Sequence, residues 1–172
     1  MEKVGSLLGE VADGYRERAA HAAALTPELK GRFPKLSRGE NYQGLPYMIL
    51  DYPAVFDRDH VFAIRTLFWW GRYFSLTLHL KGRYQARYVP ALLDVLGSRE
   101  TGNWHLAVSE DEWVHAVRES DYRRVQELSE AQRAEQGDRV FFKMVTVIPL
   151  DLWDQVPGLL EERFGELLGW MG

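Results

Sequence analysis

Apolar residues near the start of the chain recur every three or four positions, a spacing typical of a helix with one buried side. The pattern covers residues 3–25, and its buried side should hold Val4, Leu7, Leu8, Val11, Tyr15 and Ala19. Thr26 followed by Pro27 is a new start signal, because threonine caps helices and proline is favoured in the first turn. A short second helix should run to about Arg32. Residues 33–46 hold two prolines and two glycines and are interpreted as an ordered loop.

Three later stretches have the composition of β-strands. The first covers residues 47–52 and should end at Pro53, the second covers 60–70, and the third covers 73–81. Gly71 and Arg72 are interpreted as a two-residue hairpin turn, with glycine where a type II′ turn needs it. The third strand alternates apolar and polar residues, which predicts that one face of the sheet is core and carries Phe74, Leu76, Leu78 and Leu80.

The length of the turn decides which side chains share a face of the sheet. A two-residue turn would pair Ile64 with His79 on one face. It would pair Arg65 with Leu78 on the leucine face, so that Arg65 and His79 would point to opposite sides of the sheet.

The second half of the chain adds more helices and strands. We expect a helix over 84–97, a strand over 104–108, a helix that opens at the capping pattern of Ser109 and Glu112, and another helix from about 120 to 137. A strand over 139–149 and a final helix from Pro157 follow. The order predicts one α+β domain over residues 1–172. Its antiparallel or mixed sheet should have about five strands, with helices at the N-terminus, between later strands and at the C-terminus. A β-α-β unit across 73–108 could add one parallel pair.

Composition narrows the classes of function. The chain has no cysteine, which excludes disulfides and thiolate sites and favours a reducing compartment. The first ten residues lack the apolar core of a signal peptide, and no stretch approaches the roughly 18 apolar residues that cross a bilayer. We therefore expect a cytoplasmic protein without a membrane partner. A net charge of −4 argues against a nucleic-acid partner, although it leaves room for a local basic face.

Two charged residues are candidates for a ligand site. Arg65 lies in an apolar strand, so its guanidinium needs a partner, and Asp51 in the neighbouring strand is the obvious one. The pair is either structural or part of an anion-binding site. His79 is interpreted as a partly exposed histidine of the sheet, with an acid or base role as the alternative.

Aromatic residues supply the other candidates. Trp70 and Tyr73, together with Phe68, could form a half-open apolar patch, which is typical of an interaction site. The alternative is that these rings are ordinary core and cross-strand packing.

These residues favour a function in binding over catalysis. Under the binding hypothesis, the protein binds a protein partner, a second copy of the chain or a small apolar or anionic ligand. The binding surface would be the aromatic sheet face or the loop 33–46. The alternative is an enzyme of unfamiliar type with an Arg65 and His79 site. No catalytic residue is assigned, because no known nucleophile or phosphate-binding motif is present. The histidines at positions 21, 60, 79, 105 and 115 have no metal-ligand spacing, so neither a metal nor a cofactor is predicted.

Overall fold

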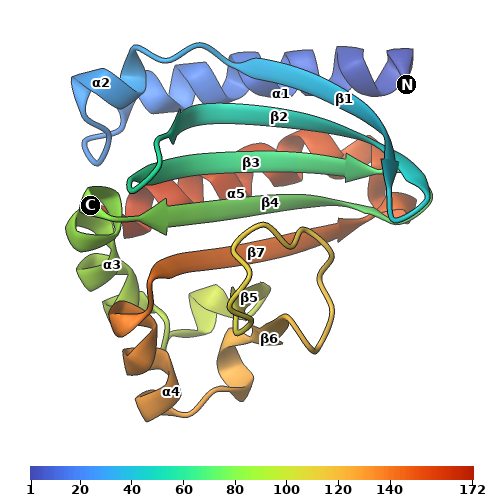
Figure 1. The fold of residues 1–172 in the computed structure, drawn as a ribbon. Coiled ribbons are helices and arrows are strands. Elements are labelled where there is room, and N and C mark those ends of the chain that lie inside the picture. Colours follow the sequence, from blue (N-terminus) through green and yellow to red (C-terminus); the bar gives the residue numbers. More distant parts are fainter.

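A seven-stranded sheet with helices on one side forms the centre of the molecule, and the computed structural model describes all residues from 1 to 172 (Figure 1). The strand order is β1-β2-β3-β4-β7-β5-β6, and every neighbouring pair is antiparallel. The predicted α+β class is confirmed, with seven strands in place of about five. The strands are β1 Lys35–Tyr42, β2 Leu45–Phe56, β3 Val61–Trp69, β4 Tyr73–Lys81, β5 Trp104–Ala107, β6 Tyr122–Arg124 and β7 Phe141–Pro149.

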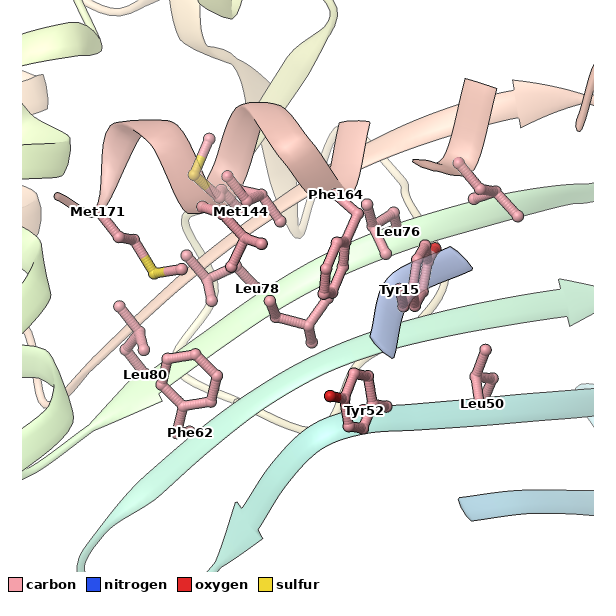
Figure 2. Packing of buried hydrophobic residues seen from close by; sticks show 14 of the residues in the cluster. Tyr15, Leu50, Tyr52, Phe62, Leu76, Leu78, Leu80, Met144, Phe164 and Met171 are labelled. Atoms are coloured by element: carbon pink, nitrogen blue, oxygen red, sulfur yellow. The ribbon is translucent and has the colours of Figure 1, made fainter. Parts of the chain in front are cut away.

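One face of this sheet, which we call the helix face, is covered by α1 Glu2–His21, α2 Pro27–Lys30, α3 Arg83–Val95 and α5 Val156–Trp170. Helix α4 Glu130–Ala134 buries no side chain and contacts the short 3-10 helix that follows it. The 3-10 helices are Arg99–Thr101, Val125–Glu127, Glu135–Asp138 and Leu150–Gln155. Figure 1 shows α1 and α5 behind the sheet. Tyr15 of α1 stacks on Phe164 of α5 with ring centroids 4.1 Å apart, and Figure 2 shows both rings among leucines of β2 and β4. The predicted stripe of α1 and the predicted leucine face are therefore buried in one core.

The turn between β3 and β4 holds three residues, 70–72, so the predicted two-residue turn is wrong. The amide of Arg72 donates to the carbonyl of Trp69 at 3.0 Å, and Gly71 has a φ of +67°. A glycine with positive φ is what a type II turn needs at its third position. The turn thus begins one residue earlier than predicted, and β3 pairs one position out of the predicted register.

This shift exchanges the faces on which the residues of β3 lie. Arg65 pairs with Thr77 and Ala63 pairs with His79, so Arg65 leaves the leucine face. Arg65 and His79 share the face opposite the helices, which corrects the prediction that they point to opposite sides. We call this the polar face, and its charged and polar members include Lys35, Asp51, Arg65, Thr77, His79, Lys81 and Lys143.

Two segments of the first half also differ from the prediction. Residues 35–42, expected in a loop, form β1 at the edge of the sheet, where glycine is tolerated better than in a central strand. Strand β2 does not end at Pro53. It continues to Phe56 because a bulge between Asp51 and Ala54 takes the proline out of the regular ladder.

Residues 109–121 contain no helix, contrary to the prediction, and the expected helix over 120–137 is replaced by β6, α4 and two 3-10 turns. The apolar side chains of Tyr122, Val125 and Leu128 in this segment are nevertheless buried. The expected parallel pair is also absent, because β7 lies between β4 and β5 and is antiparallel to both. No helix combines the length and apolar character needed to span a bilayer.

Candidate binding site on the polar face

A row of charged residues crosses the first three strands on the polar face. Lys35 of β1 is paired with Asp51 of β2, and Asp51 with Arg65 of β3. The Nε and Nη2 atoms of Arg65 donate to the two carboxylate oxygens of Asp51 at 2.7 and 2.8 Å. This two-pronged geometry is the strongest form of a carboxylate–guanidinium pair. The structure thus contains the ion pair between Arg65 and Asp51 that was expected from the sequence.

A cavity of about 740 Å³ opens over this row, and we call it the Arg65 cavity. Three aromatic side chains line it, and all three are unusually exposed for their size: Phe33 at 80 %, Phe56 at 47 % and Trp113 at 49 %. Its other lining residues are Gly31, Arg32, Lys35, Ser37, Asp51, Ala54 and Arg65. The three cations and one carboxylate among them give a net charge of 3 − 1 = +2. The cavity therefore combines aromatic walls with an excess of positive charge.

Trp113 belongs to an irregular segment, residues 109–118, that crosses the polar face and that we call the strap. Tyrosine side chains of the sheet hold its backbone. The hydroxyl of Tyr42 accepts hydrogen bonds from the amides of His115 and Ala116, each at 3.0 Å, and the hydroxyl of Tyr73 accepts one from Val117 at 3.0 Å. These bonds satisfy amides that no helix or strand pairs, so they fix the strap on the sheet.

A buried lysine holds the middle of the strap. The ammonium of Lys143 on β7 donates to the carbonyl oxygens of Glu112 and Val114, both at 2.8 Å, and the hydroxyl of Tyr122 donates to Val114 at 2.7 Å. Lys143 is only 3 % exposed. Burial, together with the nearby charge of Arg65, lowers the pKa of Lys143 to about 7, because both disfavour its protonated form.

Two neutral histidines lie at the strap, His79 beneath it and His115 within it. His79 contacts the carboxylate of Glu112 at 3.2 Å, and Lys81 contacts its other oxygen at 3.0 Å. Burial and the charge of Lys143 lower the pKa of His79 to about 4, and the same two causes lower the pKa of His115 to about 3. Neutral His115 accepts a 3.4 Å hydrogen bond from Arg65 through its Nε2 atom.

This arrangement limits the chemistry of the two histidines. His79 is buried, and the aromatic rings of Trp113 and Phe141 lie 5.2 and 5.9 Å from its own ring. A neutral imidazole beside a carboxylate has the groups that a general base requires. A substrate could reach this imidazole only if the strap moved. No three His, Asp or Glu side chains lie close enough together to hold a metal ion.

The structure does not bring all five predicted site residues together. Asp51 and Arg65 line the Arg65 cavity, whereas His79 lies beneath the strap. Trp70 is in the hairpin turn and packs edge-on against Phe68, which is buried on the helix face. Tyr73 lies on the polar face as a support for the strap. The predicted patch of Trp70, Phe68 and Tyr73 is therefore divided between two faces.

The residues that complete the cavity were not predicted from the sequence. Phe33 does lie in an irregular part of the candidate loop 33–46 but was not singled out, Phe56 lay beyond the predicted end of its strand, and Trp113 fell in a predicted helix. Glu112 was interpreted as part of a helix-capping pattern, although it is the carboxylate partner of His79. Lys143 gave the one available signal, because a lysine inside an otherwise apolar central strand requires polar partners.

Comparisons with known proteins give no match to this chain, whether with protein families, with curated proteins or with solved structures.

Proposed function

We propose that the protein is a binding domain whose ligand places an anionic group beside an aromatic or apolar group in the Arg65 cavity. One observation supports this proposal above the others. Of the six exposed large hydrophobic residues, three line this single cavity, namely Phe33, Phe56 and Trp113. Exposed apolar residues that gather in a concave site, together with a few charged groups, are typical of ligand-binding sites.

The charge of the cavity favours an anion. Lys35 forms no ion pair, and Arg32 has only the exposed carboxylate of Glu28 at 3.7 Å. Arg65 uses two of its nitrogens for Asp51, and its third faces the weak contact with His115. Because the chain as a whole carries −4, this positive region is a local departure that would attract an anionic ligand over about one Debye length.

A second cavity, of about 650 Å³, between α1 and α5 gives less support to a ligand site. Its charged residues nearly balance, and Arg18 already faces Glu161 at 3.7 Å. No aromatic ring of Phe, Tyr or Trp lines it, so it offers no stacking surface, and its charged residues leave no excess of positive charge.

An enzymatic function is the weaker alternative. Arg65 and His79 do share a face, and His79 does have a carboxylate partner in Glu112. The imidazole is closed off by the strap, however, and it does not line the cavity that holds Arg65. The arrangement therefore supports recognition at the Arg65 cavity more than acid–base chemistry there.

Isothermal titration calorimetry with 2-naphthoate, an anionic aromatic probe, tests this proposal. The uncharged 2-naphthamide should bind more weakly. Lys35→Glu and Phe33→Ser should each weaken naphthoate binding by about three- to tenfold, because they reverse a lining charge or remove an aromatic wall. The matched controls are Arg38→Glu and Leu36→Ser, since both are exposed residues of β1 that lie on the opposite face from the cavity.

If Lys35→Glu and Arg38→Glu weaken naphthoate binding equally, the probe senses only the net charge of the protein. That result, or binding that Phe33→Ser leaves unchanged, contradicts the proposed site.

A further inference from the structure

Strand β1 leaves one edge of the sheet unpaired. It is the first strand in the sheet order and pairs with β2 alone. Its regular pairing covers Lys35 to Gly39, before a bulge that precedes Tyr42. In an antiparallel strand every second residue directs its N–H and C=O away from the partner strand, so this part of the edge offers free donors and acceptors. An extended segment can complete such an edge.

The free edge borders the Arg65 cavity. Lys35 and Ser37 of β1 line the cavity, while Leu36 and Arg38 point to the opposite face. A strand added to β1 would lie about 4.8 Å away. A side chain of that strand, opposite Lys35, would therefore stand at the entrance of the cavity, within reach of its ammonium group.

The charge along the regularly paired part of β1 is one-sided, with Glu40 just beyond it and Glu28 facing Arg32. Residues 29–39 contain Lys30, Arg32, Lys35 and Arg38 and no Asp or Glu. Leu36, between the two cations of β1, is 45 % exposed and offers an apolar contact. Carboxylates opposite Lys35 and Arg38, with an apolar residue opposite Leu36, would match this edge because opposite charges on paired strands attract.

We propose that an extended, acidic segment of a partner protein adds to the sheet as a strand along Lys35 to Gly39 and places a side chain in the Arg65 cavity. This inference rests on the proposed function, because the cavity would be part of the site that the segment occupies. Main-chain hydrogen bonds would supply affinity, and the charged and apolar pairs would supply specificity.

The same charges argue against the two other occupants. Pairing of this edge with itself in a second copy would bring two Lys35 and two Arg38 residues together without a carboxylate in the regular part of either strand. A nucleic acid would be attracted by the cations, but it would leave the free N–H and C=O groups of β1 without partners in a regular pattern.

The probe is the peptide acetyl-Thr-Glu-Thr-Val-Glu-Thr-amide, titrated at up to millimolar concentration into isotope-labelled protein and followed by NMR. In antiparallel pairing its glutamates lie opposite Lys35 and Arg38, and its valine lies opposite Leu36. Two further peptides carry N-methyl groups at alternate residues, one at the odd and one at the even positions. Only one set should weaken binding by about tenfold or more, because only one set has its N–H groups directed at β1.

Chemical-shift changes should be concentrated at residues 35–39. Arg38→Glu should weaken peptide binding but leave naphthoate binding unchanged, since Arg38 does not line the cavity. Four results would each overturn the inference. Both methylated peptides could lose affinity equally, or the peptide could cause no shifts at residues 35–39. A thymidine dodecanucleotide could bind more tightly than the peptide, or the protein could self-associate through β1. If naphthoate still binds and its affinity depends on Lys35, the proposed function holds and only the strand-addition inference fails. If naphthoate binding does not depend on Lys35, the proposed function fails as well.

Discussion

The guanidinium of Arg65 donates two parallel hydrogen bonds, of 2.7 and 2.8 Å, to the carboxylate of Asp51 at the floor of the cavity. The side chains are 19 % and 8 % exposed, so the charges are largely removed from water. A buried pair of this kind is costly to break from one side, because the remaining charge loses its partner without regaining its hydration.

We therefore expect Asp51→Asn to lower the free energy of unfolding by roughly 2 to 4 kcal/mol in urea titrations. Glu161→Gln is the control, because Glu161 and its partner Arg18, 3.7 Å apart, are 31 % and 46 % exposed and such surface pairs contribute under about 1 kcal/mol. Adding Arg65→Met to Asp51→Asn should restore much of the loss. If the double variant is no more stable than the single one, the unpaired guanidinium is not the cause.

The buried ammonium of Lys143 makes the stability depend on pH. Its pKa is lowered to about 7 in the folded protein, below the 10.5 of an ordinary lysine, so the unfolded chain binds more protons between these values. The free energy of unfolding should therefore rise with pH between about 7.5 and 9.5, by at most about 1.4 kcal/mol per pH unit from this group. Above that range the buried tyrosines oppose the trend, because burial raises the pKa of Tyr15 and Tyr122.

Lys143→Met provides the comparison. Unfolding titrations of both proteins at several pH values should show a steeper rise for the wild type. Parallel curves would mean that Lys143 keeps its ordinary pKa in the folded state.

The hydroxyl of Tyr42 accepts hydrogen bonds from two consecutive backbone amides of the strap, those of His115 and Ala116. Tyr42→Phe should leave both amides without a partner, at a cost of about 1 to 3 kcal/mol. Amide hydrogen exchange at residues 115 and 116 should become faster, while exchange in β3 and β4 stays slow. Tyr47→Phe on the neighbouring strand is the control, because the hydroxyl of Tyr47 makes no hydrogen bond. Similar exchange in the two variants would show that the tyrosine hydroxyl does not hold the strap.

Two glycines with positive φ should respond differently to alanine. Gly71 has a φ of +67° but no atom within 4 Å of the added methyl group, so Gly71→Ala should cost only about 1 to 2 kcal/mol of backbone strain. Gly82 has a φ of +62°, and a methyl group there would overlap the carbonyl oxygen of Asp59 and the ring of His60. Gly82→Ala should cost about 3 kcal/mol or more, measured by thermal or urea unfolding. Equal losses would contradict the packing around Gly82.

Periodicity of the sequence was sufficient for the parts of the fold whose environment is set by neighbours in the chain. The three- and four-residue spacing of α1 corresponds to its buried side, and the leucines that alternate after Gly71 lie in the core. The polar residues between them, Ser75, Thr77 and His79, are buried as well, so the predicted partial exposure of His79 was wrong. The register of β3 was wrong because a single glycine serves both a two-residue and a three-residue turn, and the choice moves every side chain to the other face. This one-residue error in register is why Arg65 and His79 were predicted on opposite faces of the sheet.

The strap could not be predicted from local pattern at all. Ser109 and Glu112 have the spacing of a capping box, yet no helix follows them. Their conformation is fixed by distant side chains, above all Tyr42, Tyr73 and Lys143. The Arg65 cavity depends on the same long-range placement, because Phe33, Phe56 and Trp113 are brought together only by the folded sheet and strap.

The most direct measurement of the binding site is the map of backbone amide shifts that 2-naphthoate causes in isotope-labelled protein. We expect the largest changes at residues 31–37, at 54–56 and at Trp113, around the floor formed by Arg65. Changes centred instead on the groove between α1 and α5, or no localised changes at saturating probe, would contradict this expectation.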